Sequence, residues 1–227
     1  VIEFDADQNQ LLLENGKTLR YDFLIVATGL ESHFDTIEGI SKKMIGDHGL
    51  ASIYNPFCAT RSFALLETLA QKSKSQKINT LFSEPNTAIK SINAPKQFLY
   101  LTHDYIKENG IVKNVQFEYL TQKKALTPLK EFKKPMQLQF EQRGFTTELQ
   151  STLLEVDPIR QEATFSQTII DQGKYSETTK AYEVIRKNIT TTKPYDLLHI
   201  IPHMSAPKSI SESNLVTKKS PLLDINP

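Results

Sequence analysis

Short apolar stretches and polar segments follow one another at the start of the chain. Val1–Phe4 and Leu11–Leu13 are mainly apolar and flank a polar segment, which predicts two strands joined by a hairpin turn. In the following stretch, Leu19–Ala27, the last five residues are all apolar. This run predicts a strand buried on both faces of a layered α/β domain. Thr28 and Gly29 end it abruptly.

The middle of the chain changes from helical to strand periodicity more than once. Apolar residues in Phe57–Leu69 recur at helical spacing, and the short apolar run Ile78–Phe82 predicts a strand. A second helix is expected over Lys96–Glu108, closed by Gly110, before a strand over Val115–Tyr119. A helix-to-strand succession of this kind is typical of βαβ units.

The pattern weakens toward the end of the chain. Ile169–Lys193 is mostly polar, and we expect a long surface loop or insertion there. The tail from Pro202 onward has no periodicity. The remaining expected elements are a helix over Leu129–Arg143, which Pro135 would weaken, a hairpin of strands Glu148–Val156 and Gln161–Phe165, and a last strand over Tyr195–Ile201.

Composition excludes several classes of function. The chain has 39% hydrophobic and 23% charged residues, which is typical of a soluble globular protein. Its 27 basic and 26 acidic side chains nearly cancel, so nucleic acid is not an expected partner. No apolar run approaches the roughly 20 residues of a transmembrane helix. The lone Cys58 and the spacing of the five histidines do not predict a metal site.

Three ordered segments resemble one family of flavoproteins. They are the strand and turn Tyr21–Gly29, the segment Glu84–Leu101 with its Pro-Asn-Thr-Ala-Ile-Lys-Ser string, and Tyr195–Pro207 with Leu-His followed by Met-Ser-Ala-Pro. Together they are similar to sulfide:quinone oxidoreductases of the mitochondrial type. The resemblance implies an α/β chain that forms the middle portion of a two-domain Rossmann-like flavoprotein fold and is incomplete at both ends.

The resemblance also implies a division into domains. Residues 1–44 would be the returning part of the FAD domain, made of hairpins and the Ala-Thr-Gly strand. Residues 45–190 would form an inserted region that is similar to a nucleotide-binding domain but has no glycine-rich loop. Residues 191–227 would return toward the FAD domain and end in an irregular tail.

The cofactor of this family is FAD, and the resemblance places Val1, Thr28 and Gly29 against it. A small residue and a glycine at the end of a strand let the backbone approach a diphosphate, although a buried strand ending in a tight turn would show the same pattern. Other flavin-binding segments of the family are not in this sequence, so we do not expect the chain alone to hold FAD.

A nicotinamide nucleotide is not expected at the inserted region. The segment Ser83–Asn86 follows a strand where pyridine-nucleotide reductases have a glycine-rich turn. It contains no glycine, loses one amide at Pro85 and adds the anionic Glu84. A different electron donor, such as sulfide, would be consistent with that loss.

Ser91 stands where the family has a cysteine that carries sulfur as a disulfide or persulfide beside the flavin. A hydroxyl has no such chemistry, so Ser91 is the position of the family's catalytic residue without its function. A polar cap for the following helix is the alternative interpretation. Cys58 lies outside the motif and is expected to be a small buried hydrophobe. His203 replaces a proline of the family, and a role near a quinone is a guess.

Two functions follow from the resemblance. The first is FAD-mediated electron transfer from sulfide to ubiquinone in mitochondria, with peripheral association to the inner membrane through regions outside this chain. The second is a structural or accessory subunit derived from that enzyme and kept, with partner proteins, in a larger respiratory assembly. Replacement of the cysteine favours the second, so whether the chain belongs to an active enzyme stays open at this point.

Overall fold

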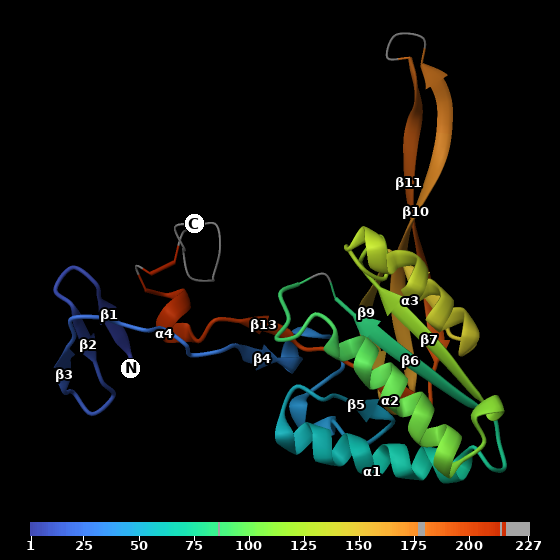
Figure 1. The fold of residues 1–227 in the computed structure, drawn as a ribbon, viewed down its shortest axis with the longest axis horizontal. Coiled ribbons are helices and arrows are strands. Elements are labelled where there is room, and N and C mark those ends of the chain that lie inside the picture. The colour runs from blue at the N-terminus through green and yellow to red at the C-terminus, as the bar shows by residue number, and fades with distance from the viewer. Residues whose placement is uncertain (86, 177–179, 214, 217–227) are drawn as a thin grey trace. The chain divides into compact units, whose positions relative to one another are not determined.

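A five-stranded parallel sheet forms the centre of the larger of two structural units (Figure 1). The structure, a computed structural model, describes residues 1–85, 87–176, 180–213 and 215–216, so Asn86 of the motif and the end of the tail lie outside the described residues. Unit 1 comprises Val1–His33, Ala88–Lys90 and His203–Pro227, and unit 2 comprises Phe34–Thr87 and Ser91–Pro202.

The parallel sheet of unit 2 has the strand order β5-β12-β6-β7-β8. Its central strand β6 is buried or half-buried along its whole length, because other layers cover the sheet on both faces. This confirms the expected βαβ arrangement around Ile78–Phe82 and Val115–Tyr119. The strands are β5 Leu50–Ala51, β12 Leu197–His199, β6 Ile78–Glu84, β7 Val115–Thr121 and β8 Thr146–Leu149.

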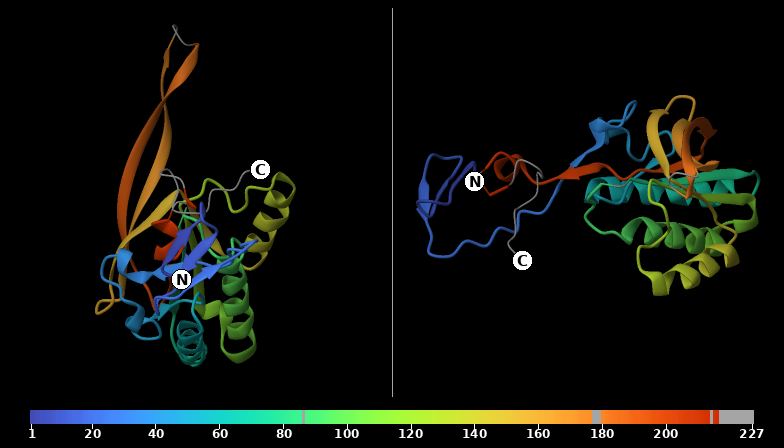
Figure 2. Two further views of the ribbon diagram at one scale, coloured as in Figure 1. Left: turned by 90° about the vertical axis from the view of Figure 1, so that its left-hand side faces the viewer. Right: turned by 90° about the horizontal axis from the view of Figure 1, so that it is seen from above.

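Three helices cover one face of this sheet, namely α1 Pro56–Lys72, α2 Ala94–Asn109 and α3 Lys130–Gln142 (Figure 2). Asn55 caps α1 by accepting a hydrogen bond from the Phe57 amide at 3.0 Å, and Pro56 follows at the first helical position. Gly110 ends α2, as expected. Pro135 lies within α3 without ending it, and Phe140 of this helix is buried against the sheet.

An antiparallel sheet of three strands lies on the opposite face. Its strands, in the order β11-β10-β9, are β9 Ser151–Asp157, β10 Glu162–Ser176 and β11 Ala181–Pro194. Val156, Ala163 and Phe165 from this sheet pack with Leu81 and Leu198 of the parallel sheet. Unit 2 is therefore a three-layer structure of helices, parallel sheet and antiparallel sheet (Figure 2).

The expectation of a surface loop over Ile169–Lys193 is wrong, because most of these residues pair as strands. They form most of a long hairpin, in which Ile169 lies opposite Lys187 and Asp171 opposite Ile185, and whose distal part projects away from the rest of unit 2 (Figure 1). The third strand pairs only with Glu162–Gln167, and beyond that point the side chains whose burial is described are half-buried or exposed, as at Asp171, Lys187 and Thr190. Because neither face is buried there, apolar and polar residues do not alternate as they do in a half-buried strand.

Unit 1 contains a small antiparallel meander and a two-stranded ribbon. The expected strand over Leu19–Ala27 ends at Arg20, and residues 21–30 have no regular structure. Phe23 and Ile25 are 94% and 90% exposed, because no described strand pairs with this segment and no layer covers it. The elements are β1 Glu3–Asp5, β2 Gln10–Leu12, β3 Thr18–Arg20, β4 Glu31–His33 paired with β13 His203–Ser205, and the short helix α4 Lys208–Ser211.

The boundaries of the units differ from the expected 1–44, 45–190 and 191–227. The strand expected to return to the FAD side, Tyr195–Ile201, instead lies at the heart of unit 2, because β12 pairs with both β5 and β6. Residues 34–44 also belong to unit 2, where Phe34, Ile37 and Ile40 are buried in its core. The two units therefore meet between His33 and Phe34 and again between Pro202 and His203. Among the described residues, no helix has the length and apolar character to cross a bilayer.

His199 is a titratable group inside the core of unit 2. Its ring is fully buried at the end of β12, 4.6 Å from the Phe98 ring and 6.0 Å from the Phe82 ring between centroids. Neither ring nitrogen has a hydrogen-bond partner among the described residues. Burial lowers the pKa of His199 from 6.5 to about 3.

This burial predicts an acid-sensitive fold. Because the pKa in the folded state lies below that in the unfolded state, the contribution of His199 is complete above pH 6.5 and is lost as pH falls toward 3. We expect the free energy of unfolding in urea to fall by about 2 kcal/mol between pH 6.5 and 5 on this account. His199→Phe should remove that slope, whereas the exposed control His48→Asn should keep it. Equal slopes in the His199→Phe and wild-type proteins would contradict the assignment.

Candidate functional site

Five side chains meet at the carboxyl edge of the parallel sheet, around the buried carboxylate of Glu84. The Lys96 Nζ lies 3.2 Å from Oε2 and 3.4 Å from Oε1, and the Lys123 Nζ lies 2.6 Å from Oε1. The hydroxyls of Tyr119 and Thr121 donate to Oε2 at 2.6 and 3.1 Å. Both carboxylate oxygens are therefore fully engaged, and we call this group the Glu84 cluster.

Strand register brings the members of the cluster together. β6 and β7 pair in parallel with Glu84 opposite Thr121 and Phe82 opposite Tyr119, so these side chains share the face that the helices cover. Lys96 reaches the carboxylate from the first turn of α2. Lys123 reaches it from the segment that follows β7.

The cluster holds its carboxylate in the ionised form. Burial alone would raise the pKa of Glu84, but the charge of Lys96 and the hydrogen bonds from Lys123 and Tyr119 outweigh burial and lower the pKa. Burial also lowers the pKa of Lys96, and the charge of Glu84 opposes that shift. Burial, together with the charge of Glu84, raises the pKa of Tyr119 well above 10, so its phenol stays protonated and donates.

This arrangement differs from an edge that binds a dinucleotide. In such a fold, free amides of a glycine-rich turn face the pyrophosphate at the helix N-terminus. Here the strand ends in a buried carboxylate, and Lys96 in the first turn of α2 is already paired with it. The segment between β6 and α2 contains no glycine, so it lacks the turn whose free amides would receive a phosphate.

Ser91 is exposed in the segment between β6 and α2. Helix α2 begins at Ala94, and its N-cap position is Asn93. Ser91 contributes only its carbonyl, which accepts a hydrogen bond from the Ala94 amide at 3.3 Å. The interpretation of Ser91 as the side-chain cap of this helix is therefore wrong, and its hydroxyl makes no hydrogen bond to the described residues.

Cys58 lies far along the sequence from Ser91 and is buried. It lies in the first turn of α1 with no exposed surface, packed in the core between the two sheets. Burial raises the pKa of its thiol, which favours the protonated and unreactive form. It packs as the small buried hydrophobe that the sequence predicts.

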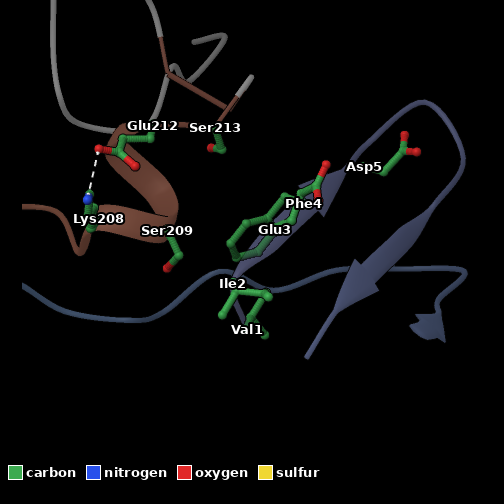
Figure 3. Close-up of a pocket in the computed structure, with 9 residues that line it drawn as sticks. All are labelled: Val1, Ile2, Glu3, Phe4, Asp5, Lys208, Ser209, Glu212 and Ser213. Carbon is green, nitrogen blue, oxygen red and sulfur yellow. Dashed lines mark ion pairs between the residues drawn. The ribbon is translucent and has the colours of Figure 1, made fainter. Parts of the chain in front are cut away.

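Val1 lies at a pocket of unit 1. The pocket has a volume of about 720 Å³, and residues 1–5 line one side of it while α4 lines the other (Figure 3). Lys208 and Glu212 form an ion pair of 3.6 Å at its edge. Phe4 also lines the pocket and packs against Ala206 and Ile210. Val1 itself is about half exposed.

Thr28 and Gly29 are exposed in the irregular segment of unit 1. Gly29 has a φ of +73°, in the left-handed region that favours glycine, and a Cβ atom built there would have no neighbour within 4 Å. Another group can therefore approach this backbone closely, as a flavin diphosphate would require. The residues expected at the flavin, Val1, Thr28 and Gly29, all belong to unit 1, whereas Ser91 belongs to unit 2.

Two histidines of unit 1 face each other across the β4–β13 ribbon. His203 lies opposite His33, and the His33 Nε2 is 2.8 Å from the Ser205 Oγ. Within the part of the chain that the structure describes, no three His, Cys, Asp or Glu side chains are close enough to hold a metal ion. His203 therefore lies opposite another histidine in the ribbon, and this position alone does not indicate a role at a quinone.

The sequence pointed to Glu84 as an anion but missed the partners that surround it. One signal was available. A lysine in the first turn of a helix is disfavoured by the helix dipole, so a negative charge close to Lys96 would be favourable. The contribution of Tyr119, Thr121 and Lys123 depends on strand register, which the sequence alone did not specify.

Comparison with known proteins places these features in a family context. No protein-family model matches the sequence. The chain is 27% identical to the mitochondrial sulfide:quinone oxidoreductase of Dictyostelium discoideum over 224 residues, which are 99% of the chain and 42% of that protein. The resemblance to sulfide:quinone oxidoreductases is confirmed. The mitochondrial enzyme of Mus musculus is also 27% identical, over 99% of the chain and 43% of its own length.

Solved structures confirm the α/β, Rossmann-like fold of the chain. The sulfide:quinone oxidoreductase from Aquifex aeolicus superposes with a TM-score of 0.72 at 15% identity, covering 97% of this chain and 46% of that one. A chain from the mitochondrial ATP synthase of Tetrahymena thermophila superposes with a TM-score of 0.67 at 18% identity, covering 99% of this chain and 50% of that one. The chain thus spans half or less of the length of each of these four proteins.

Proposed function

We propose that this chain is the central portion of a mitochondrial flavoprotein of the sulfide:quinone oxidoreductase type that does not oxidise sulfide. The observation that carries the proposal is Ser91, an exposed serine where the family has its sulfur-carrying cysteine. The only cysteine of the chain, Cys58, is buried in the core and cannot substitute for it. Ubiquinone, FAD and the inner membrane enter the proposal through the family alone.

The chemistry of the family position depends on sulfur. In the family, sulfide would open a disulfide made by this cysteine, so that one sulfur keeps the incoming sulfur as a persulfide and the other leaves as a thiolate. A bound flavin would supply the two-electron acceptor that this chemistry needs. A serine hydroxyl has neither reaction, because it stays protonated near neutral pH and forms no bond to a second sulfur under these conditions. Electron entry from sulfide by this route therefore stops at Ser91, whatever the rest of the protein binds.

The residues of unit 1 fit a share of a flavin site. The open backbone at Gly29 leaves room for a diphosphate, and Thr28 beside it is exposed. Val1 lies at the pocket of about 720 Å³. When FAD is bound, its isoalloxazine supplies the two-electron chemistry, and Val1, Thr28 and Gly29 would help to position the cofactor.

The proposal is tested by sulfide-dependent reduction of a soluble ubiquinone analogue with the full-length protein. We expect no turnover above the protein-free blank for the Ser91 form, because no sulfur intermediate can form at this position. Ser91→Ala should behave identically, which makes it the matched control. Ser91→Cys introduces a thiol at this exposed position, and turnover in that form alone would identify it as the lost catalytic position. Robust turnover by the Ser91 form would refute the proposal.

We propose as a second candidate that the protein is an accessory subunit of a respiratory assembly. The observation that favours it is the superposition of 99% of this chain on a chain from the mitochondrial ATP synthase of Tetrahymena thermophila. The Ser91 substitution supports it too, since a scaffold does not need the thiol. A bound flavin is not required for this role.

The two candidates make different predictions for the native protein. If the accessory role holds, native electrophoresis of gently solubilised mitochondrial membranes should show the protein co-migrating with a large complex. The purified protein should then be colourless, because it carries no stoichiometric flavin. A yellow protein that migrates alone, with the visible absorption of bound flavin, would exclude the accessory role and leave the flavoprotein candidate.

A further inference from the structure

A groove on unit 2 uses none of the residues assigned above. It has a volume of about 420 Å³ and lies between the segment after β7, helix α3 and strand β8. Phe140 and Phe145, both buried, line it together with the partly buried Leu126 and Leu149. The Phe140 and Phe145 rings meet edge to face with centroids 5.4 Å apart. The two rings and the two leucines therefore give the groove an apolar wall.

Two lysines stand at the same groove without counter-ions. Lys124 and Lys133 both line it, both are exposed, and neither forms an ion pair with a described residue. The neighbouring Lys123 is already paired with Glu84. The acid that lines the groove, Glu141, accepts a hydrogen bond from the Gln137 side chain at 2.9 Å. The groove therefore carries two cations against one carboxylate.

We infer that this groove binds a small molecule with a flat aromatic body and one anionic group. The apolar wall with its two phenyl rings would hold the body, and Lys124 and Lys133 would hold the carboxylate or phosphate. The volume lies within the ordinary range of ligand sites, roughly 300–1,000 Å³. The groove also lies beside the carboxyl ends of parallel strands, where open α/β sheets commonly bind ligands. This inference is independent of the proposed function, because it depends on neither Ser91 nor a flavin.

The test compares two probes that share the naphthyl ring and differ by an anionic phosphate group. 1-Naphthyl phosphate and the uncharged 1-naphthol are titrated into the full chain by calorimetry at low salt. We expect saturable binding of the phosphate, about tenfold tighter than that of 1-naphthol, because charge-assisted hydrogen bonds form only with the anion. Added salt should weaken the phosphate alone. Equal affinity for both probes, or no binding of the phosphate at millimolar concentration, would overturn the inference.

Variants locate the binding to this groove. Lys124→Gln and Lys133→Gln should each weaken the phosphate about fivefold without changing the affinity for 1-naphthol. Lys134→Gln is the matched control, because this exposed lysine lies on the same helix but does not line the groove. Thr147→Trp should fill the groove and abolish binding of both probes, with thermal melts confirming that the variant is folded. An effect of Lys134→Gln as large as that of Lys133→Gln would place the binding elsewhere and refute the assignment.

Discussion

The carboxyl edge of the parallel sheet depends on the buried carboxylate of Glu84. A lone carboxylate without exposed surface would be strongly unfavourable, so the surrounding chain has to supply compensating charge and hydrogen bonds. Lys96 from α2 and Lys123 after β7 supply the charge, and Tyr119 with Thr121 supplies the remaining bonds. This requirement ties the start of one helix and the end of one strand to the same two oxygen atoms.

The same constraint bears on function. Rossmann-like folds bind an external anion at this edge, whereas here an internal anion engages Lys96. A short distance along the sequence, the exposed Ser91 lies in the segment leading into α2, at the position proposed for the family's cysteine. Both features agree with the proposed loss of sulfide chemistry in a chain with this α/β fold. Lys124 and Lys133 at the separate groove do not belong to the Glu84 cluster, and they give that groove a cationic surface.

Much of unit 2 could be predicted from the sequence, and less of unit 1. The helices and strands from Phe57 to Tyr119 were predicted because each buries a periodic apolar face. The hairpin over Ile169–Lys193 was missed because its distal part has solvent on both faces, so its pattern lacks alternation. The strand expected at Phe23 did not form, because a strand buried on both faces needs neighbours that the described residues do not provide. The Glu84 cluster was missed for a related reason, since register and not local pattern brings its members together.

The pairing of the buried Glu84 carboxylate with two lysines is tested most directly by urea unfolding of three variants at neutral pH. Glu84→Gln leaves the buried Lys96 without a counter-charge, and we predict that the free energy of unfolding falls by about 3–5 kcal/mol. Lys96→Met should cost less, because Lys123 still pairs with the carboxylate, and the more exposed Lys123→Met should cost least. Losses below about 0.5 kcal/mol for all three variants, the scale of ordinary surface substitutions, would contradict the account.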